Sequence, residues 1–216
     1  MPFRVCSFAL FLLVAFSTTG CIRYYAGAPA PRYNSTAKAI DTTRSAIPHK
    51  KTNIFFPTEI DLFKRKTLKQ YDADGYDVRG MYQREFLGRR SEVFVSVYPG
   101  LTENSFGGGA AYRNKQSNTF GFERQRMIGK LEAERPRVNF IGETQAPFLP
   151  ESTHNTRLIY SKKEFGLDQP SRTTLAYLYL IDNWFLNIRY ATSDLELTEA
   201  EFEADDFVRK FLSATP

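Results

Sequence analysis

The side chains that most often carry enzyme chemistry are sparse in this 216-residue sequence. The histidines are His49 and His154, and the cysteines are Cys6 and Cys21. Zinc sites are built mainly from several histidine and cysteine ligands, so we expect none here. A serine triad would need a histidine beside a Gly-x-Ser-x-Gly turn, which the sequence lacks. We therefore expect no catalytic residue, no metal and no cofactor.

Carboxylates are plentiful, but their spacing predicts structure rather than chemistry. The segment Asp72–Gly75, followed by Asp77, begins like a calcium loop but has no Glu at its twelfth position. We interpret this segment as a turn, in which Gly75 can supply a positive φ. The acidic run Glu199–Asp206 is interpreted as the solvated face of a helix.

The glycine-rich segment Gly107–Gly109 is the best candidate for a binding site. A phosphate-binding Walker loop has Lys and then Ser or Thr after its glycines, whereas Ala110 and Ala111 follow here. We interpret the segment as part of a polar surface loop over residues 99–118, and such loops often carry binding residues. The candidate binding residues are Phe106, Gly107, Gly108, Gly109, Tyr112 and Arg113.

Cys21 stands at the end of a leader-like N-terminus. Arg4 precedes the apolar run Val5–Phe16, which is too short for a membrane-spanning helix of about 20 residues. Small and polar residues then lead directly to Cys21. This order resembles the signal peptide of a bacterial lipoprotein, and the resemblance implies that residues 1–20 are removed and Cys21 is lipidated. The alternatives are secretory cleavage after Ala28 and an uncleaved anchor.

The lipoprotein resemblance also implies a location and a partner. Acyl chains on Cys21 would hold the protein on a lipid bilayer, because two or more chains give stable attachment. In bacteria with two membranes, an Asp after the lipidated cysteine usually retains a lipoprotein at the inner membrane, and here Ile22 follows. We therefore expect a protein of the cell envelope, at the outer membrane and facing the periplasm if the host has two membranes.

The net charge of +5 is unevenly distributed along the chain. Residues 22–53 hold six Lys and Arg against one Asp, whereas residues 54–216 hold 22 Lys and Arg against 23 Asp and Glu. The basic segment is rich in Ala, Thr, Ser and Pro, so we expect residues 21–53 to be a flexible tether. It is either a contact for anionic lipids or a soluble spacer. Because the domain itself is nearly neutral, we expect no nucleic-acid partner.

Hydrophobic periodicity predicts a single α+β domain over residues 54–216. The predicted strands cover residues 60–71, 76–86, 93–98, 138–148, 156–165, 173–181 and 184–190. Helices are predicted over residues 119–134 and from Thr198, where Thr198 and Glu201 form a capping-box pattern. Short turns such as Asp182–Asn183 predict one antiparallel sheet with two or more helices packed on it.

Three parts of this order resemble the PsbP/Mog1-like fold. They are the hairpin DVRGMYQREF–EVFVSVYP, the strand NWFLNIRYAT and the acidic helix after it. Members of that fold include accessory subunits, a GTPase-binding protein and bacterial lipoproteins. The resemblance implies a non-catalytic binding or accessory module with an unknown envelope protein or ligand as its partner. The alternatives are an envelope hydrolase with a scattered Asp, Glu, Tyr and Arg site, and a structural envelope protein.

Overall fold

The computed structural model describes residues 38–40, 46–100, 110–134, 139–149, 154–162, 172–193 and 195–214. Cys21 and the leader lie outside these residues, as do Phe106, Gly107, Gly108 and Gly109. No helix within the described residues is long and apolar enough to cross a bilayer.

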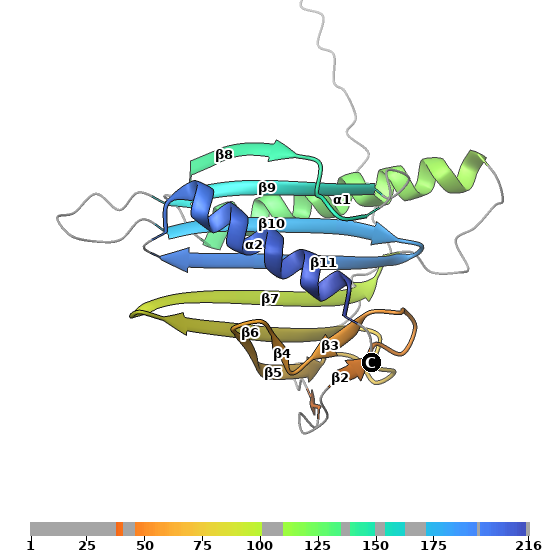
Figure 1. Ribbon diagram of the computed structural model, residues 1–216. Coiled ribbons are helices and arrows are strands. Elements are labelled where there is room, and N and C mark those ends of the chain that lie inside the picture. The colour runs from red at the N-terminus through yellow and green to blue at the C-terminus, as the bar shows by residue number, and fades with distance from the viewer. Residues whose placement is uncertain are drawn as a thin grey trace, which may run out of the picture. The chain divides into compact units, whose positions relative to one another are not determined.

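Nine strands form one antiparallel sheet (Figure 1). In space their order is β1-β5-β6-β7-β11-β10-β9-β8, and β4 pairs with β5 beside this path. The bounds are β1 Lys38–Ala39, β4 Glu59–Ile60, β5 Phe63–Gln70, β6 Val78–Phe86, β7 Arg89–Pro99, β8 Asn139–Thr144, β9 His154–Lys162, β10 Arg172–Ile181 and β11 Trp184–Ser193. A separate pair joins β2 Ala46–Pro48 to β3 Phe55–Pro57. The predicted α+β class with an antiparallel sheet is confirmed.

Two-residue turns close the two hairpins that the sequence predicted. Leu87 and Gly88 join β6 to β7 with φ values of 51° and 77°. Asp182 and Asn183 join β10 to β11, and Asp182 has a φ of 54°. Positive φ in such turns matches the right-handed twist of the flanking strands. Pairing of β7 with β11 then joins the two hairpins at the centre of the sheet.

Helix α2, Leu197–Leu212, covers one face of the sheet with an aromatic core beneath it (Figure 1). The Phe207 ring meets Phe63 and Tyr82 edge-on, with centroid distances of 5.0 and 5.4 Å. The buried residues of the helix are Ala200, Ala204, Phe207, Val208 and Phe211. The sequence predicts a buried stripe of Ala204, Phe207, Val208, Phe211 and Leu212, and it is confirmed for the first four, whereas Leu212 is only partly buried against the same core.

The predicted capping box at Thr198 is wrong. The N-cap residue is Glu196, whose side chain makes no capping hydrogen bond, and Thr198 lies inside the helix. Leu197 packs against the core beneath α2. Partial burial of this apolar side chain favours a helical position for Leu197, and the helix accordingly begins before the capping pattern.

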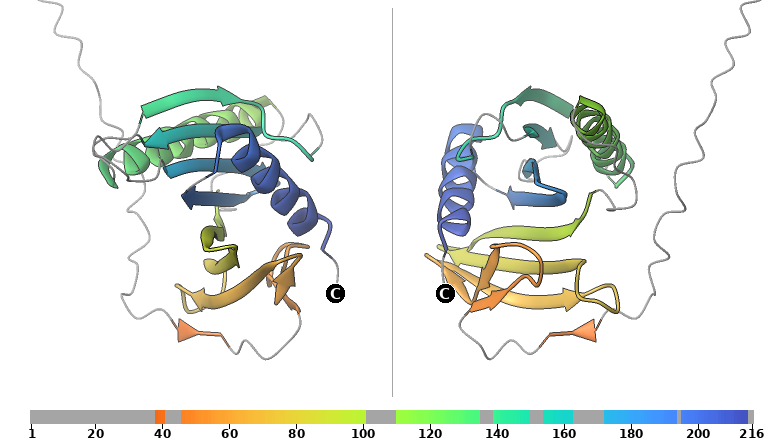
Figure 2. Two further views of the ribbon diagram at one scale, coloured as in Figure 1. Left: turned by 60° about the vertical axis from the view of Figure 1, so that its left-hand side comes forward. Right: turned by 90° about the vertical axis from the view of Figure 1, so that its right-hand side faces the viewer.

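Helix α1, Ala110–Glu134, covers part of the opposite face (Figure 2). Met127 and Leu131 pack there against Leu158 and Leu178 of β9 and β10. The helix begins nine residues before the predicted start at Thr119. The residues before Thr119 include several good helix formers but no apolar stripe, so a prediction based on periodicity misses them.

The folded domain begins before the predicted boundary at residue 54. His49 is 3% exposed and contacts the Trp184 ring edge-on at 5.0 Å. Its Nε2 donates a hydrogen bond to the Tyr76 carbonyl at 3.0 Å, and its Nδ1 accepts one from the Thr52 hydroxyl at 3.1 Å. Residues 46–53 therefore belong to the domain, and the prediction that they form a flexible tether is wrong.

Candidate functional site

A groove of about 460 Å³ lies between α1 and the part of the sheet that α1 leaves uncovered. Its floor comes from β5, β6, β7 and β11, and its wall comes from the second half of α1. We call it the basic groove because five of its lining side chains are cations. These are Lys69 on β5, Arg79 on β6, Arg189 on β11, and Arg126 and Lys130 on α1.

Strand register sets the positions of the cations on the floor. Lys69 stands directly opposite Arg79 on the neighbouring strand. Like charges in that arrangement repel and reduce stability, so this pair is not explained by a need to stabilise the sheet. Two residues further along β6, Met81 lies opposite Phe94 of β7. Phe94 in turn lies opposite Arg189 of β11.

Each of the three arginines lies over an aromatic ring. The guanidinium carbon is 4.3 Å from the ring centroid for Arg79 over Tyr71, 5.2 Å for Arg189 over Phe94 and 5.9 Å for Arg126 over Tyr98. A ring face attracts a cation and restricts its orientation without neutralising it. The aromatic residues therefore hold positive charge in place in the groove.

Two buried carboxylates neutralise part of this charge. Asp77, which is 4% exposed, receives hydrogen bonds from Arg79 Nε and Nη2, both at 3.1 Å. Glu123, which is 7% exposed, receives one from Arg126 Nε at 2.7 Å and one from the Tyr98 hydroxyl at 2.6 Å. Among the described residues, the groove thus brings five cations together with two buried carboxylates.

The chemistry of the groove favours binding over proton transfer. Burial, and then the neighbouring Glu123 carboxylate, raise the pKa of Tyr98 far above its ordinary value, so this hydroxyl stays protonated as a donor. Arginine side chains cannot act as bases because they remain charged. No group of three or more metal-binding side chains occurs in the described part of the chain. Guanidinium groups can, however, bind phosphate or carboxylate through paired hydrogen bonds.

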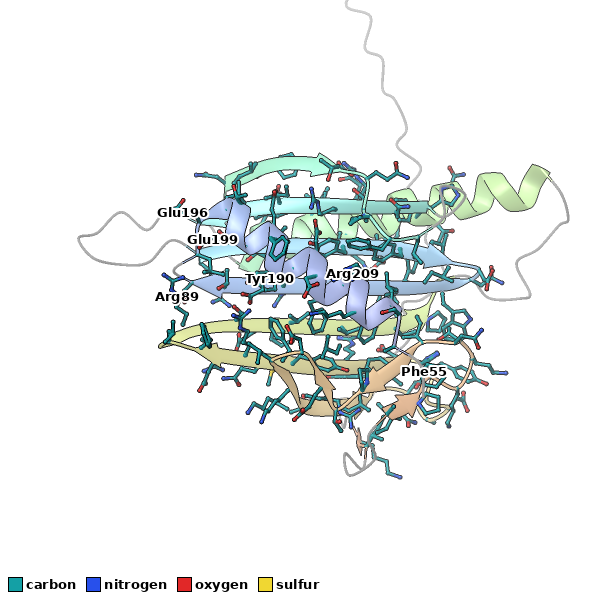
Figure 3. The ribbon with its side chains drawn as sticks, viewed as in Figure 1. Phe55, Arg89, Tyr190, Glu196, Glu199 and Arg209 are labelled. Atoms are coloured by element: carbon teal, nitrogen blue, oxygen red, sulfur yellow. The ribbon has the colours of Figure 1, made fainter. Side chains whose placement is uncertain are left out.

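A second cavity, of about 580 Å³, lies beside α2 on the opposite face. Arg84 donates a hydrogen bond to one oxygen of Glu203 at 2.5 Å, and the Tyr190 hydroxyl donates one to the other oxygen at 3.0 Å. Figure 3 shows Tyr190 on the sheet behind α2, and Arg89 near Glu199 at one end of the helix. Both carboxylate oxygens of Glu203 are thus engaged in holding α2 on the sheet.

The prediction that the acidic run of α2 is a solvated face is wrong for two of its members. Glu203 is held as just described. Asp205 accepts hydrogen bonds from Arg157 at 2.8 Å and from the Tyr177 hydroxyl at 2.6 Å. Arg84 and Arg157 lie on β6 and β9, far apart in sequence from the helix, so only the folded sheet makes these pairs visible.

The predicted binding loop receives no support from the described residues. Tyr112 and Arg113 lie in the first turns of α1, so the prediction that they belong to a loop is wrong. The rest of that candidate site, Phe106–Gly109, lies outside the described residues. By contrast, the turn predicted at Asp72–Gly75 is confirmed, since the Asp72 carboxylate accepts backbone hydrogen bonds from Tyr76 at 2.8 and 3.0 Å.

No known protein-family model matches this chain, and no curated protein matches it in sequence.

The basic groove was not predicted from the sequence. Its cations are distributed over residues 69–189, and no local motif links them. The one local signal is an alternation in sequence, in which Asp77 directly precedes β6 and Arg79 and Met81 follow on that strand.

Proposed function

We propose that this chain is a lipid-anchored envelope protein whose folded domain is a non-catalytic binding module for an anionic ligand. The observation that carries the proposal is the basic groove, where five cations meet two carboxylates within about 460 Å³. Ordinary small-molecule sites have volumes of this order. The carboxylates of the groove are already hydrogen-bonded, Asp77 to Arg79 and Glu123 to Arg126 and Tyr98.

The anchoring part of the proposal rests on Cys21. The apolar run Val5–Phe16 and the small residues before Cys21 are the features that support lipidation. Lys38 on β1 follows Cys21 by 17 residues. Even fully extended, that length of chain spans at most about 60 Å. An anchor at Cys21 would thus hold Lys38 within about 60 Å of the envelope surface.

We also propose that the domain is PsbP/Mog1-like. Three features support this. The β6–β7 and β10–β11 hairpins pair at the centre of the sheet, α1 lies between them in the sequence, and the C-terminal helix α2 covers one face. Proteins with a shared fold differ widely in function. The fold therefore supports an accessory or binding role only in combination with the groove.

The anchor is tested by metabolic labelling. Cells producing the full chain are fed radiolabelled palmitate, and the label should enter the wild-type protein but not the Cys21→Ser variant. Equal labelling of the two proteins would overturn lipidation at this residue.

The groove is tested by titrating the isotope-labelled full chain with hexyl phosphate at low salt. We expect NMR shifts to concentrate at residues 69–81, 123–130 and 187–189. Arg189→Gln should weaken binding several-fold, because it removes one of five cations. Arg209→Gln removes the same charge from α2 on the opposite face and serves as the matched control. Equal effects of the two variants, or shifts spread over the whole surface, would contradict a site in the groove.

A further inference from the structure

We infer that the tip of the β6–β7 hairpin is a membrane-contact site, where apolar side chains enter a lipid bilayer between its headgroups and acyl chains. The inference goes beyond the proposed function, because it gives the folded domain a contact with lipid that needs neither Cys21 nor the basic groove. It follows from the side chains that the turn exposes and from the backbone strain with which it holds them.

The turn carries a large apolar side chain where stability favours a small polar one. Leu87 is 85% exposed and has a φ of 51°. Asn and Gly adopt this conformation at low cost, whereas a bulky side chain is strained in it. Leu87 gains almost no burial in return, so the stability of the domain does not explain its presence. Backbone strain of this kind is concentrated at functional positions.

Two exposed phenylalanines extend the apolar surface of Leu87. Phe86 precedes it on β6 and is half exposed, and Phe202 on α2 is 77% exposed. Phe86 and Phe202 both line the cavity beside α2, so the strand and the helix contribute to one surface. We call Phe86, Leu87 and Phe202 the apolar tip. Single exposed apolar residues are ordinary on a protein surface, whereas a group of them marks a contact with a protein or a membrane.

The arginines beside the apolar tip match the headgroup layer of a bilayer. Arg89 directly follows the turn, and Arg90 is the next residue. Arg89 lies 4.0 Å from Glu199 and Arg90 lies 2.6 Å from Glu92, yet both arginine side chains remain more than half exposed. A long arginine side chain can keep its charge among the headgroups while neighbouring apolar residues lie deeper. Its guanidinium group also pairs well with phosphate.

The shape of the tip favours a bilayer over a protein partner. The turn closes the β6–β7 hairpin at one end of the sheet, so Leu87 lies on a projecting turn and not in a cavity (Figure 1). A projecting apolar side chain can enter a fluid bilayer without a preformed pocket, whereas a protein partner would have to supply one.

The predicted anchor leaves the tip free to reach the same bilayer. Lys38 pairs with Gln70, which pairs in turn with Val78 at the start of β6, so β1 lies at the other end of that strand from the turn. The nine residues of β6 span roughly 30 Å. Because the chain from Cys21 to Lys38 can extend to about 60 Å, an anchor at Cys21 permits contact between the tip and the membrane.

The inference is tested by tryptophan fluorescence in vesicles of phosphatidylethanolamine and phosphatidylglycerol that carry bromine on their acyl chains. Bromine quenches a tryptophan that enters the acyl region. Every full chain carries Cys21→Ser, so that lipidation cannot contribute. Trp184 is the one tryptophan of the sequence, and it pairs with Pro99 at the end of β7 remote from the turn, so it supplies the baseline.

Leu87→Trp and Phe202→Trp should each add emission that the brominated lipids quench severalfold. Phe122→Trp is the matched control, because Phe122 is 72% exposed but lies on α1, away from the apolar tip. Its added emission should not be quenched.

Leu87→Asn separates insertion from folding, because it relieves backbone strain and should stabilise the domain. Combined with Phe202→Trp, it should reduce the quenching at position 202 severalfold, since loss of an inserted leucine weakens insertion about tenfold or more. Leu87→Met keeps the apolar surface and should retain the quenching. Urea unfolding shows that each variant is folded.

The outcomes separate this inference from the proposed function. Equal quenching at positions 87, 122 and 202 would show non-specific adsorption and overturn the membrane-contact site. No quenching at positions 87 and 202 would also overturn it and would leave lipidation and anion binding standing, since neither uses the tip. A blue shift at position 87 that grows with protein concentration in the absence of vesicles would assign the tip to a second copy of the chain instead.

Discussion

The Tyr98 hydroxyl donates a hydrogen bond of 2.6 Å to Glu123 and so joins strand β7 to helix α1. Both residues are buried. Because the acceptor is a carboxylate, this bond is stronger than one between neutral groups. It holds one wall of the basic groove against the floor, and the stability of the groove should depend on it.

Tyr98→Phe should therefore destabilise the protein by about 2 kcal/mol, because it leaves a buried carboxylate with one donor fewer. Urea unfolding measures the loss. Tyr160→Phe is the matched control, since the Tyr160 hydroxyl is buried with no hydrogen-bond partner among the described residues. That variant should leave the free energy of unfolding unchanged or raise it, because it removes a buried hydroxyl that has no hydrogen-bond partner. Equal losses in the two variants would contradict this account.

The attachment of α2 should depend on Asp205 more than on the exposed acids of the same helix. Asp205→Asn disrupts the pair with Arg157, whose side chain is 16% exposed. We expect a loss of about 2 kcal/mol, below the usual cost for a fully buried pair because Asp205 retains 28% exposure. Glu199→Gln should stay within about 0.5 kcal/mol of wild type, since its side chain is 61% exposed and 4.0 Å from Arg89.

A double-mutant cycle with Tyr177 tests the same network. Tyr177→Phe should cost less in the Asp205→Asn background than in the wild type, because the two groups share a hydrogen bond of 2.6 Å. Additive losses would show that the hydroxyl and the carboxylate act independently.

Stability should fall when the pH drops below about 6.5, the ordinary pKa of histidine, because of His49. Burial lowers the pKa of His49 in the folded state, against smaller opposing effects from the Tyr76 carbonyl and nearby carboxylates. The unfolded chain therefore binds the proton more readily, and stability declines from pH 6.5 down to the lowered native pKa. Urea unfolding between pH 5 and 7.5 measures the decline.

The His49→Gln variant should lose most of this pH dependence. His154→Gln is the matched control, because His154 stands at the start of β9 with its ring stacked on Phe120 at 5.8 Å. If both variants kept the wild-type slope, another group would have to carry the pH effect.

The β6–β7 turn offers a substitution that should increase stability. Leu87 has a positive φ of 51° and its side chain is 85% exposed, so the residue is strained and buries little. Leu87→Asn should raise the free energy of unfolding by up to about 1 kcal/mol, because Asn tolerates this conformation. Thermal unfolding measures the change.

Gly88 gives the opposite test in the same turn. Its φ is 77°, and a Cβ added there would meet nothing within 4 Å. Gly88→Ala should therefore cost about 1 kcal/mol from backbone strain alone. A neutral Gly88→Ala variant would mean that the turn relaxes, and the Leu87→Asn gain should then be absent as well.

The sequence could predict those parts of the fold that local patterns specify. Alternating residues and two-residue turns identified the hairpins around Leu87 and Asp182, and the apolar stripe ending at Leu212 identified α2. It could not predict elements that depend on distant contacts. His49 belongs to the domain because it meets Trp184, a residue 135 positions later, and no local pattern contains that contact.

The candidate site was missed for a related reason. Arg79 and Arg189 are separated by 110 residues in the sequence. They lie on the floor of the same groove only because β6 pairs with β7 and β7 pairs with β11. The net charge of residues 54–216 is close to zero, and a net charge does not show where in the fold the individual charges lie. The register of the strands supplies that information.

The ion pairs of α2 also limit what its acidic residues can do beyond the domain. Glu203 and Asp205 are paired with Arg84 and Arg157 of the sheet. Paired charges largely cancel each other at a distance, so these acids contribute little to the electric field outside the protein. They act on the sheet beneath them rather than on a distant charged surface.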